Sequence, residues 1–290
     1  MSASPEQGGN TSESTYVVDA ESAAEMARLV RQDQLLTQDM GGIFPENPDL
    51  SNVQRIVDLA CGPGGWVLEV AFRYTDIEVV GVDISQRMID YASAKARVQR
   101  LSNASFQVMN ILKPLAFDDA SFDLVNTRMI ATFMPRDAWP KLFAECLRIL
   151  RPGGILRFTD VEVGMSNKPA FEKAWNMVEQ AMSRANMNFS PNGLHWGIIH
   201  MLPRFFQQAG LHHIGKMAYA VDFSAGTEIR EGFYHDFASG FQSVEPFMEK
   251  MRVATVAEWR EVYQKALTEM GEEDFCAMWI LLTVWGQKPA

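Results

Sequence analysis

Short hydrophobic runs alternate with amphipathic segments through the first half of the chain. The hydrophobic runs predict strands at Arg55–Leu59, Glu78–Val82, Ser105–Met109, Phe122–Asn126 and Ile155–Asp160. Between them, apolar side chains recur at the spacing of a buried helical face, which predicts helices at Gly64–Tyr74, Ser85–Arg100 and Asp137–Leu150. Strands and helices that alternate in this way predict βαβ units and a parallel sheet, so the expected fold class is α/β.

The segments on either side of this region are less regular. A helix with Asp19 as its cap is expected at Asp19–Gln38. After residue 161 the pattern predicts two helices, a strand, a helical stretch and a last strand, at Pro169–Met187, Gly197–Gln208, His213–Phe223, Glu228–Met270 and Phe275–Trp285. Gly240 and Pro246 are expected to interrupt the helical stretch.

Composition and charge narrow the class of protein. The chain has 290 residues, of which 47% are hydrophobic, and this suits one elaborated domain with a full core. A net charge of −10 without a basic cluster argues against nucleic acid as a partner. The three cysteines are scattered, so we expect no zinc site or disulfide and a cytoplasmic location. No apolar run reaches the length of a membrane span, so no membrane partner is expected, and polar residues 1–14 predict a disordered tail.

A glycine-rich turn follows the first predicted strand. Asp58 ends the hydrophobic run, and Gly62, Gly64 and Gly65 come before the amphipathic helix. Glycines allow backbone conformations that are closed to other residues and allow a ligand to approach closely. The free N–H groups of the following helix would point at that ligand. The stretch therefore predicts a site for a nucleotide-like cofactor.

Four motifs resemble those of the class I S-adenosylmethionine-dependent methyltransferases. They are residues 58–64 (DLACGPG), 79–85 (VVGVDIS), 121–125 (SFDLV) and 150–154 (LRPGG), in the order and spacing of that family, and residues 284–289 (VWGQKP) are similar to the usual end of its seventh strand. The most similar branch is that of small-molecule enzymes related to ubiquinone biosynthesis. The resemblance implies a doubly wound, Rossmann-like sheet of seven mostly parallel strands, with an antiparallel last strand and helical lid insertions.

The resemblance also implies S-adenosyl-L-methionine as the cofactor. Asp83 would accept bonds from the two ribose hydroxyls, because one carboxylate can accept from both donors. Asp58 would orient the amino-acid end of the cofactor, or cap the turn instead. The remaining cofactor-binding candidates are Ala60, Gly62, Gly64, Ile84, Met88, Asn110, Ile111, Asn126 and Arg128. Ala60 stands where the family often has glycine and is expected to have ordinary dihedrals, and Arg128 is equally suited to a salt bridge with a helix.

Three histidines are candidates for a general base. His195, His200 and His235 lie in the segments after the fifth strand, where substrate walls form in such enzymes, and an imidazole accepts protons near neutral pH. For each one singly, a surface or packing role is the competing explanation. Expected substrate contacts are Tyr16, Glu162, Trp196 and Tyr234.

These residues define a hypothesis about function and domain organisation. We expect methyl transfer to a small, mostly apolar or aromatic metabolite, with an oxygen acceptor favoured over carbon or nitrogen. Residues 15–45 would form a helical lid, and residues 46–290 the methyltransferase domain with caps at about 165–210 and 226–272. A monomer or homodimer is expected, with a role in secondary metabolism.

Two other classes of function remain open. One is a non-catalytic cofactor-binding regulator. The other is a nicotinamide-dependent dehydrogenase, which also wants an acidic residue after its second strand, but Val67 occupies the third glycine position of its motif.

Overall fold

The computed structural model describes residues 16–162 and 164–290. The tail expected at residues 1–14 lies outside them. Along the chain the elements are α1 (Ala23–Asp39), β1 (Arg55–Leu59), α2 (Gly65–Arg73), β2 (Glu78–Asp83), α3 (Gln86–Gln99), β3 (Ala104–Val108), β4 (Phe122–Arg128), the 3₁₀ turn η1 (Ile130–Thr132), α4 (Trp139–Ile149), β5 (Leu150–Val161), β6 (Met165–Ser166), α5 (Pro169–Arg184), α6 (Ile198–Gln208), β7 (His212–Asp222), α7 (Arg230–Ser243), α8 (Glu245–Lys250), α9 (Val256–Met270) and β8 (Ala277–Gln287). The described helices include none that is long and apolar enough to cross a membrane.

The sheet has the expected doubly wound order. Its strands run β3-β2-β1-β4-β5-β8-β6, and β7 also pairs with β8. β1 to β5 are parallel, whereas β8 is antiparallel to β5, β6 and β7, as the motifs predicted for the last strand. The two-residue strand β6 adds an eighth strand, which is too short to produce a hydrophobic pattern in the sequence.

Successive strand residues point to opposite faces of the sheet and enter two separate cores. Ile56 of β1 packs with Trp66 and Val67 of α2 in one core. Val57, the next residue of β1, belongs to the other core with Trp139 and Phe143 of α4. Both faces are therefore covered, as a parallel sheet requires.

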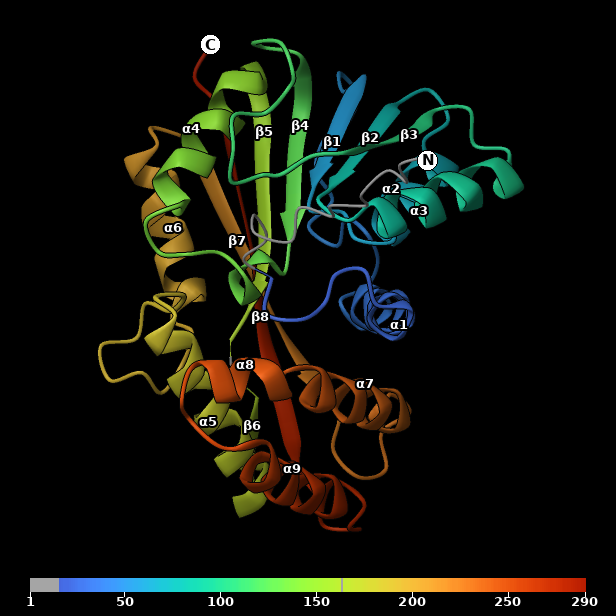
Figure 1. The fold of residues 1–290 in the computed structure, drawn as a ribbon. Coiled ribbons are helices and arrows are strands. Elements are labelled where there is room, and N and C mark those ends of the chain that lie inside the picture. The colour runs from blue at the N-terminus through green and yellow to red at the C-terminus, as the bar shows by residue number, and fades with distance from the viewer. Residues whose placement is uncertain (1–15, 163) are drawn as a thin grey trace, which may run out of the picture.

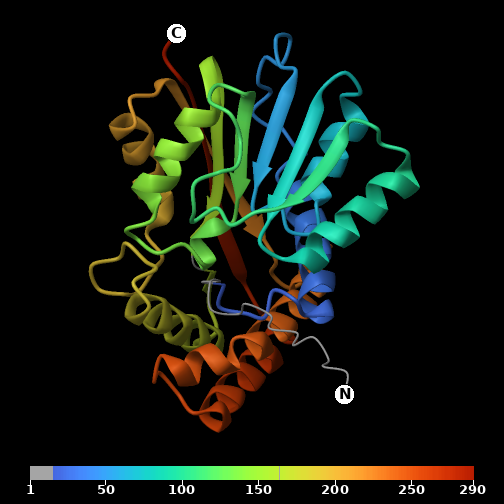
Figure 2. The ribbon, with the colours of Figure 1, turned by 45° about the horizontal axis from the view of Figure 1, so that its top comes forward.

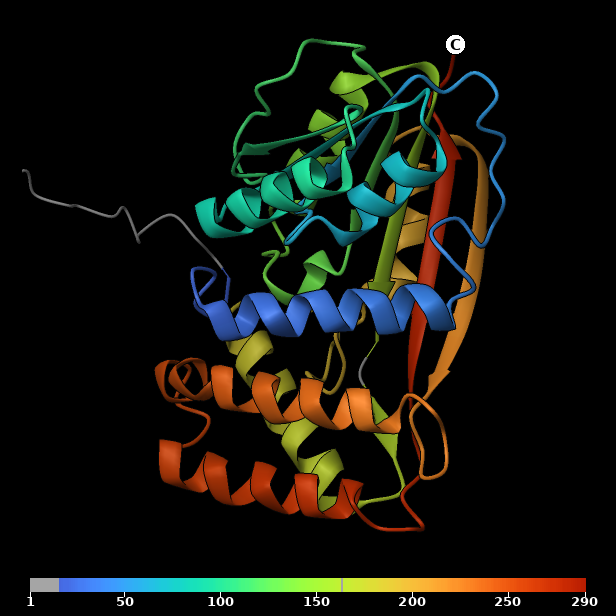
Figure 3. The ribbon, with the colours of Figure 1, turned by 90° about the vertical axis from the view of Figure 1, so that its right-hand side faces the viewer.

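A layer of helices lies beyond the carboxyl ends of the parallel strands. In Figures 1 and 2 the helices α5, α7, α8 and α9 form the lower part of the molecule, away from β1 to β4. Figure 3 shows α1 running between this layer and the sheet with its helices, almost parallel to α7. The edge of the sheet where cofactor motifs gather therefore faces α1 and α7.

Two expected boundaries were wrong, at Asp19 and at Gly240, whereas the interruption expected at Pro246 lies within two residues of that position. The cap of α1 is Ser22, whose side chain accepts the N–H of Glu25, and not Asp19. Gly240 lies inside α7, since one glycine costs a packed helix only about 1 kcal/mol. The break comes instead at Val244, and Pro246 lies in the first turn of α8, where a missing N–H costs nothing.

Candidate functional site

One cavity collects residues from both ends of the chain. Its volume is about 270 Å³, and it lies where β1, β2 and β4 end, below the glycine turn and against α1 and α7. Of the expected cofactor residues it is lined by Asp58, Ala60, Gly62, Asp83, Ile84, Met88, Asn110, Ile111 and Arg128. Gly64 and Asn126 are absent from the lining. The fold therefore brings together most of a set that is spread over 70 residues of sequence.

Two glycines of the turn after β1 have a backbone conformation that other residues rarely adopt. Gly62 and Gly64 have φ values of +53° and +78°, in the left-handed region that favours glycine. A Cβ on Gly62 would meet no described atom closer than Leu29 Cδ1 at 3.9 Å, so the missing side chain leaves room inside the cavity. A Cβ on Gly64 would collide with Phe106 at 2.7 Å. Gly62 therefore fits a ligand role, and Gly64 is required for packing between α2 and β3.

Ala60 does not have the dihedrals that we expected. Its φ is +57°, in the same left-handed region, where a Cβ costs about 1–2 kcal/mol. The sharp turn out of β1 imposes this conformation, and Cys61 N–H is fixed by a hydrogen bond of 2.9 Å to the carbonyl of Val82. The expectation of ordinary dihedrals was wrong, because the turn keeps its glycine geometry without the glycine.

Asp83 links the end of β2 to the glycine turn. Its Oδ2 accepts the N–H of Gly62 and its Oδ1 accepts the N–H of Ser85, both at 2.9 Å. Burial raises the pKa of Asp83, and the two backbone bonds oppose that rise. Because each carboxylate oxygen has a second acceptor position, the side chain is oriented while it can still accept ligand hydroxyls.

Asp58 stands at the end of a buried polar chain. Asn126 Nδ2 donates to Asp58 Oδ1 at 2.7 Å, and Asn126 Oδ1 accepts from Arg157 Nη1 at 2.8 Å. Arg157 in turn pairs with Glu46, and both side chains are almost fully buried. Burial raises the pKa of Asp58 to about 7, with a further contribution from the charge of Asp83. Asn126 therefore holds Asp58 in place from behind the cavity.

The expected adenine side of the cavity is apolar. Ile84, Met88 and Ile111 line it beside Asn110. The side-chain oxygen of Asn110 accepts the N–H of Leu112 at 2.9 Å, which fixes the direction of the amide. These residues remain predicted contacts of the adenine ring and its amino group.

Arg128 pairs with α1. Its guanidinium forms an ion pair with Asp33 and a hydrogen bond of 3.0 Å to Thr37 Oγ1. Burial, followed by the charge of Arg157, lowers the pKa of Arg128 to about 9. Both Arg128 and Asp33 line the cavity, so this salt bridge connects α1 to the end of β4.

A second polar cluster joins α1 to α7. Arg28 Nη1 donates to Asp236 Oδ1 at 2.9 Å, and Gln32 Nε2 donates to Asp236 Oδ2 at 3.0 Å. Arg28 also binds Glu25, which accepts a bond of 2.7 Å from the hydroxyl of Tyr16. Since Asp236 and Glu25 are buried, this cluster is a specific attachment between the two helices.

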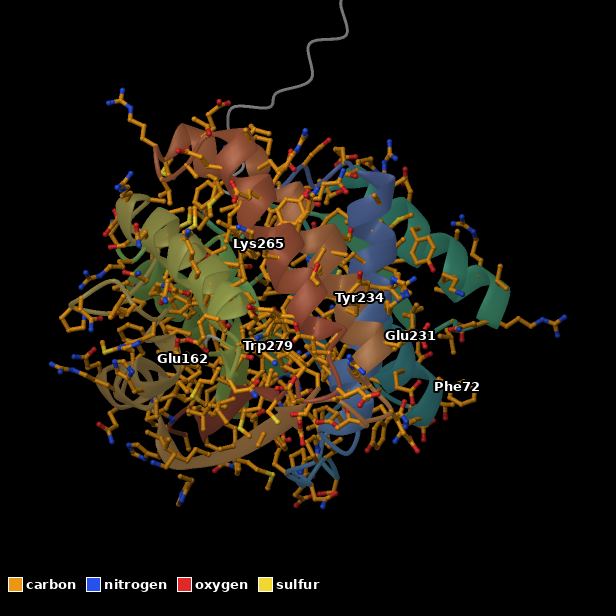
Figure 4. The ribbon with its side chains drawn as sticks, turned by 90° about the horizontal axis from the view of Figure 1, so that it is seen from below. Phe72, Glu162, Glu231, Tyr234, Lys265 and Trp279 are labelled. Carbon is orange, nitrogen blue, oxygen red and sulfur yellow. The ribbon has the colours of Figure 1, made fainter. Side chains whose placement is uncertain are left out.

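The far part of the cavity is aromatic. It is lined by Trp175, Val178, Met182, Trp196, Phe237, Phe241, Val244, Trp279 and Leu281. Seen from below in Figure 4, Trp279 lies near the middle of the molecule, whereas Phe72 lies at its margin. An apolar chamber that continues a polar cofactor site suits a substrate with an apolar or aromatic body.

The histidines lie elsewhere. His195, His200 and His235 are exposed and none lines the cavity, and His235 lies 3.9 Å from Glu231 on the surface of α7. An imidazole outside the cavity cannot reach a nucleophile bound within it, so these positions do not support the expected role as a general base. In the part of the chain that the structure describes, no His, Cys, Asp and Glu cluster is placed to hold a metal ion.

The expected substrate residues are only partly brought together. Tyr16 and Trp196 line the cavity. Glu162 instead accepts the N–H groups of Trp196 and Gly197 at 2.8 and 3.0 Å, which fixes Trp196 at the start of α6. Tyr234 packs on α7 beside His235 and is not part of the lining, and Figure 4 places it near Glu231.

Some functional candidates carried no signal in the sequence. Arg157 and Asp236 are isolated charges in apolar surroundings, and only the fold reveals their partners. Glu179 of α5 is fully buried, and burial, followed by the charge of Glu162, raises its pKa to about 9. A charge among apolar helix positions is the only clue that could have singled it out.

The described residues fit the expected cofactor. One cavity contains the open space at Gly62, the oriented carboxylate of Asp83, the apolar side chains of Ile84 and Met88, and the carboxylate of Asp58. Together these groups suit a phosphate-free nucleoside that also carries an amino acid. The lining offers no described lysine for a diphosphate.

Comparison with known proteins assigns a family to the centre of the chain. Residues 56–154 match the family model described as a methyltransferase domain. The probable methyltransferase ltbC of Aspergillus luteorubrus is 31% identical over 119 residues, which are 39% of this chain and 42% of that protein. The malonyl-[acyl-carrier protein] O-methyltransferase of Enterobacter lignolyticus is 32% identical over 126 residues, which are 43% of this chain and 45% of that protein. The chain thus spans less than half the length of these curated relatives.

A solved structure extends the likeness beyond the matched segment. Phosphoethanolamine N-methyltransferase 2 of Haemonchus contortus, in complex with S-adenosyl-L-methionine, has a TM-score of 0.52 and 19% identity, over 87% of this chain and 52% of that chain. At this identity the likeness concerns the fold.

Proposed function

We propose that this chain, a class I S-adenosylmethionine-dependent methyltransferase, methylates an oxygen atom of a small, mostly apolar or aromatic metabolite. The observation that carries the proposal is the single cavity that joins the motif residues at Gly62 and Asp83 to the aromatic chamber around Trp175 and Trp279. When bound, the cofactor supplies an activated methyl group on a sulfonium. The protein then has to bind, align and exclude water.

Each part of the cavity has a role in this proposal. Asp83 would hold the ribose and Asp58 the amino group, with Asn126 keeping Asp58 in position. Ile84, Met88 and Asn110 would hold the adenine. Closure by α1 and α7 around the cavity would exclude water, because Arg28 and Asp236 attach one helix to the other.

An oxygen acceptor that ionises readily is favoured. The described lining contains no histidine to remove a proton from a neutral alcohol. Carboxylic acids are already ionised at neutral pH, and phenols lose their protons far more readily than aliphatic alcohols do. An apolar chamber accommodates their aromatic or aliphatic bodies. One relative is named as an O-methyltransferase, which agrees with this preference.

The proposal is tested by label transfer from S-adenosyl-[methyl-¹⁴C]methionine. The acceptors are matched naphthalene derivatives that carry a phenol, a carboxylic acid or a primary amine. We expect label in the phenol or the acid, and none when Asp83→Ala replaces the wild type. Label in the amine alone would contradict the oxygen acceptor, and label in none of the three would contradict the proposed substrate class.

A further inference from the structure

Strand β7 forms an edge of the sheet. It pairs with β8 on one side only, because Val161 of β5 and Tyr219 of β7 both pair with Leu281, from opposite sides of β8. Figure 3 shows β7 beyond β8, at the margin of the sheet. Among the described residues, no hydrogen bond joins the outer backbone groups of Lys216–Asp222 to another segment. These N–H and C=O groups are therefore open to a further strand.

This edge is regular and unobstructed. Lys216–Asp222 pair with Val284–Met278 of β8 without a shift in register, and the bulge of β7 comes earlier in the strand, before Gly215. Bulges and prolines are common means of preventing an edge from pairing, and the stretch after Gly215 contains neither. Ala218 and Ala220 are exposed, and their small side chains allow another strand to approach.

The stretch is complementary to a second copy of itself. Two identical edge strands related by a two-fold axis run antiparallel, and the axis passes through a residue, because opposite residues point to the same face of a sheet. With the axis at Tyr219, Lys216 of each copy lies opposite Asp222 of the other. An axis at Ala218 or Ala220 would place Lys216 opposite an uncharged residue. Only the register centred on Tyr219 thus joins opposite charges.

Asp222 lies beside a second carboxylate. Burial, followed by the charge of Asp222, raises the pKa of Asp39 at the end of α1. Neither carboxylate has an ion-pair partner among the described residues, and Lys216 is exposed and has none either. A lysine on an edge usually discourages pairing, but here the lysine of a second copy would approach two carboxylates.

We propose that this chain forms a two-fold symmetric homodimer in which the β7 edges of two copies pair antiparallel, with Tyr219 at the axis. Such a joint has about six to eight backbone hydrogen bonds and an ion pair at each end, and it places Met217 of each copy opposite Val221 of the other. None of residues 212–222 lines the cavity, so the pairing does not occupy it. The inference does not depend on the reaction proposed above.

Charge reversal tests the ion pairs. In sedimentation velocity experiments, we expect the full chain to be dimeric at concentrations up to about 100 µM. Lys216→Glu or Asp222→Lys should each raise the dissociation constant of the dimer about tenfold or more, because the ion pair occurs twice and becomes a repulsion. The two changes in one chain, or a mixture of the two single variants, should restore the dimer. Lys95→Glu, at an exposed position of α3, is the control and should change nothing.

Cysteine cross-linking tests the register. Residue 219 would lie opposite its own copy, with the Cβ atoms about 4.5–5.5 Å apart, so Tyr219→Cys should give a disulfide-linked dimer on mild oxidation. Ala218→Cys should not cross-link alone, because residue 218 lies opposite residue 220, but it should cross-link when mixed with Ala220→Cys. All variants also carry Cys276→Ser, because Cys276 is an exposed native cysteine.

A chain that sediments as a monomer over the whole concentration range would overturn the inference, and β7 would then be a solvated edge or the site of a different partner. A dimer that is insensitive to both charge reversals would also overturn it. So would a dimer that the combined change does not restore, or a disulfide that forms more readily in Ala218→Cys than in Tyr219→Cys.

Discussion

The side-chain amide of Asn126 donates a hydrogen bond of 2.7 Å to the carboxylate of Asp58. The other end of the same amide accepts from Arg157, which is itself paired with the buried Glu46. Both the nitrogen and the oxygen of the Asn126 amide are therefore hydrogen-bonded within the protein. Asn126 lies outside the cavity lining, although the sequence suggested it as a direct cofactor contact. It acts by fixing the direction in which Asp58 presents its second oxygen to the cavity.

Cofactor affinity should depend on pH through Asp58. Burial raises the pKa of Asp58 to about 7, so the group is mostly protonated at pH 6 and mostly ionised at pH 8. Only the ionised form attracts the ammonium group of S-adenosylhomocysteine, so affinity should rise with pH through this range. A gain of roughly tenfold between pH 6 and pH 8 is expected by calorimetry. Asp58→Asn should bind more weakly and without this pH dependence, and an unchanged profile in that variant would assign the titration to another group.

Replacing Asp83 should weaken cofactor binding more than it weakens the fold. Asp83→Ala removes charge-assisted bonds worth about 1.5–3 kcal/mol, which is about 10- to 150-fold in the dissociation constant of S-adenosylmethionine. Asp123 is a matched control, because its carboxylate also accepts two backbone N–H groups, of Gln54 and Arg55, but outside the cavity. Asp123→Ala should leave affinity unchanged. Equal affinity in the Asp83→Ala variant and the wild type would remove the ribose assignment.

A side chain at Gly62 should block the cofactor without unfolding the chain. The left-handed backbone makes Gly62→Val strained, by about 1–2 kcal/mol, but the nearest described atom leaves room for the Cβ. Cofactor binding should be lost while far-UV circular dichroism stays near that of the wild type. Gly153→Val is the control: φ there is +76°, nothing lies within 4 Å, and the residue does not line the cavity. A Gly62→Val variant that still binds the cofactor would show that the turn has only a structural role.

The sequence predicted the central sheet well and the substrate region poorly. β1 was predicted at its observed bounds, because a continuous apolar run bordered by charge and glycine leaves few alternatives. Asp83 and Gly62 line one cavity, as the motifs at the ends of two neighbouring strands suggested, and their role in cofactor binding stays a prediction. The histidines were not placed correctly, because residue type indicates what a side chain can do but not which surface it occupies.

The side of the cavity formed by α1 and α7 depends on contacts between residues that are far apart in the sequence. Arg28 and Asp236 are separated by 208 positions, and neither belongs to a motif. The chain leaves the helical conformation near Val244 and again in residues 251–255, on either side of α8. These two breaks depend on how α8 packs on α9, and the glycine and proline residues nearby predict their positions only in part. Such features follow from tertiary packing and could not be read from local patterns.

Helix α1 should become protected when the cofactor binds. Its residues Leu29, Asp33 and Leu36 line the cavity, and the Arg28–Asp236 pair attaches it to α7. Hydrogen exchange of the α1 amides should slow on addition of S-adenosylhomocysteine.

Asp236→Ala should speed hydrogen exchange in α1 and lower the affinity for S-adenosylhomocysteine. Asp274→Ala, which removes an exposed partner of Lys168, should do neither. Deleting the whole helix is a poorer test, because Leu36 and Met40 are buried in the core. If hydrogen exchange in α1 is the same with and without S-adenosylhomocysteine, α1 has only a structural role.

Calorimetric titration of the chain with S-adenosylhomocysteine and, separately, with NAD tests the central claim most directly. Both ligands carry an adenosine that Asp83 and the glycine turn could hold, but only NAD carries a diphosphate, for which the described cavity offers no lysine and two arginines already paired with Asp33 and Asp236. The account predicts saturable binding of S-adenosylhomocysteine, lost in Gly62→Val, and no binding of NAD. Binding of NAD without binding of S-adenosylhomocysteine would contradict it.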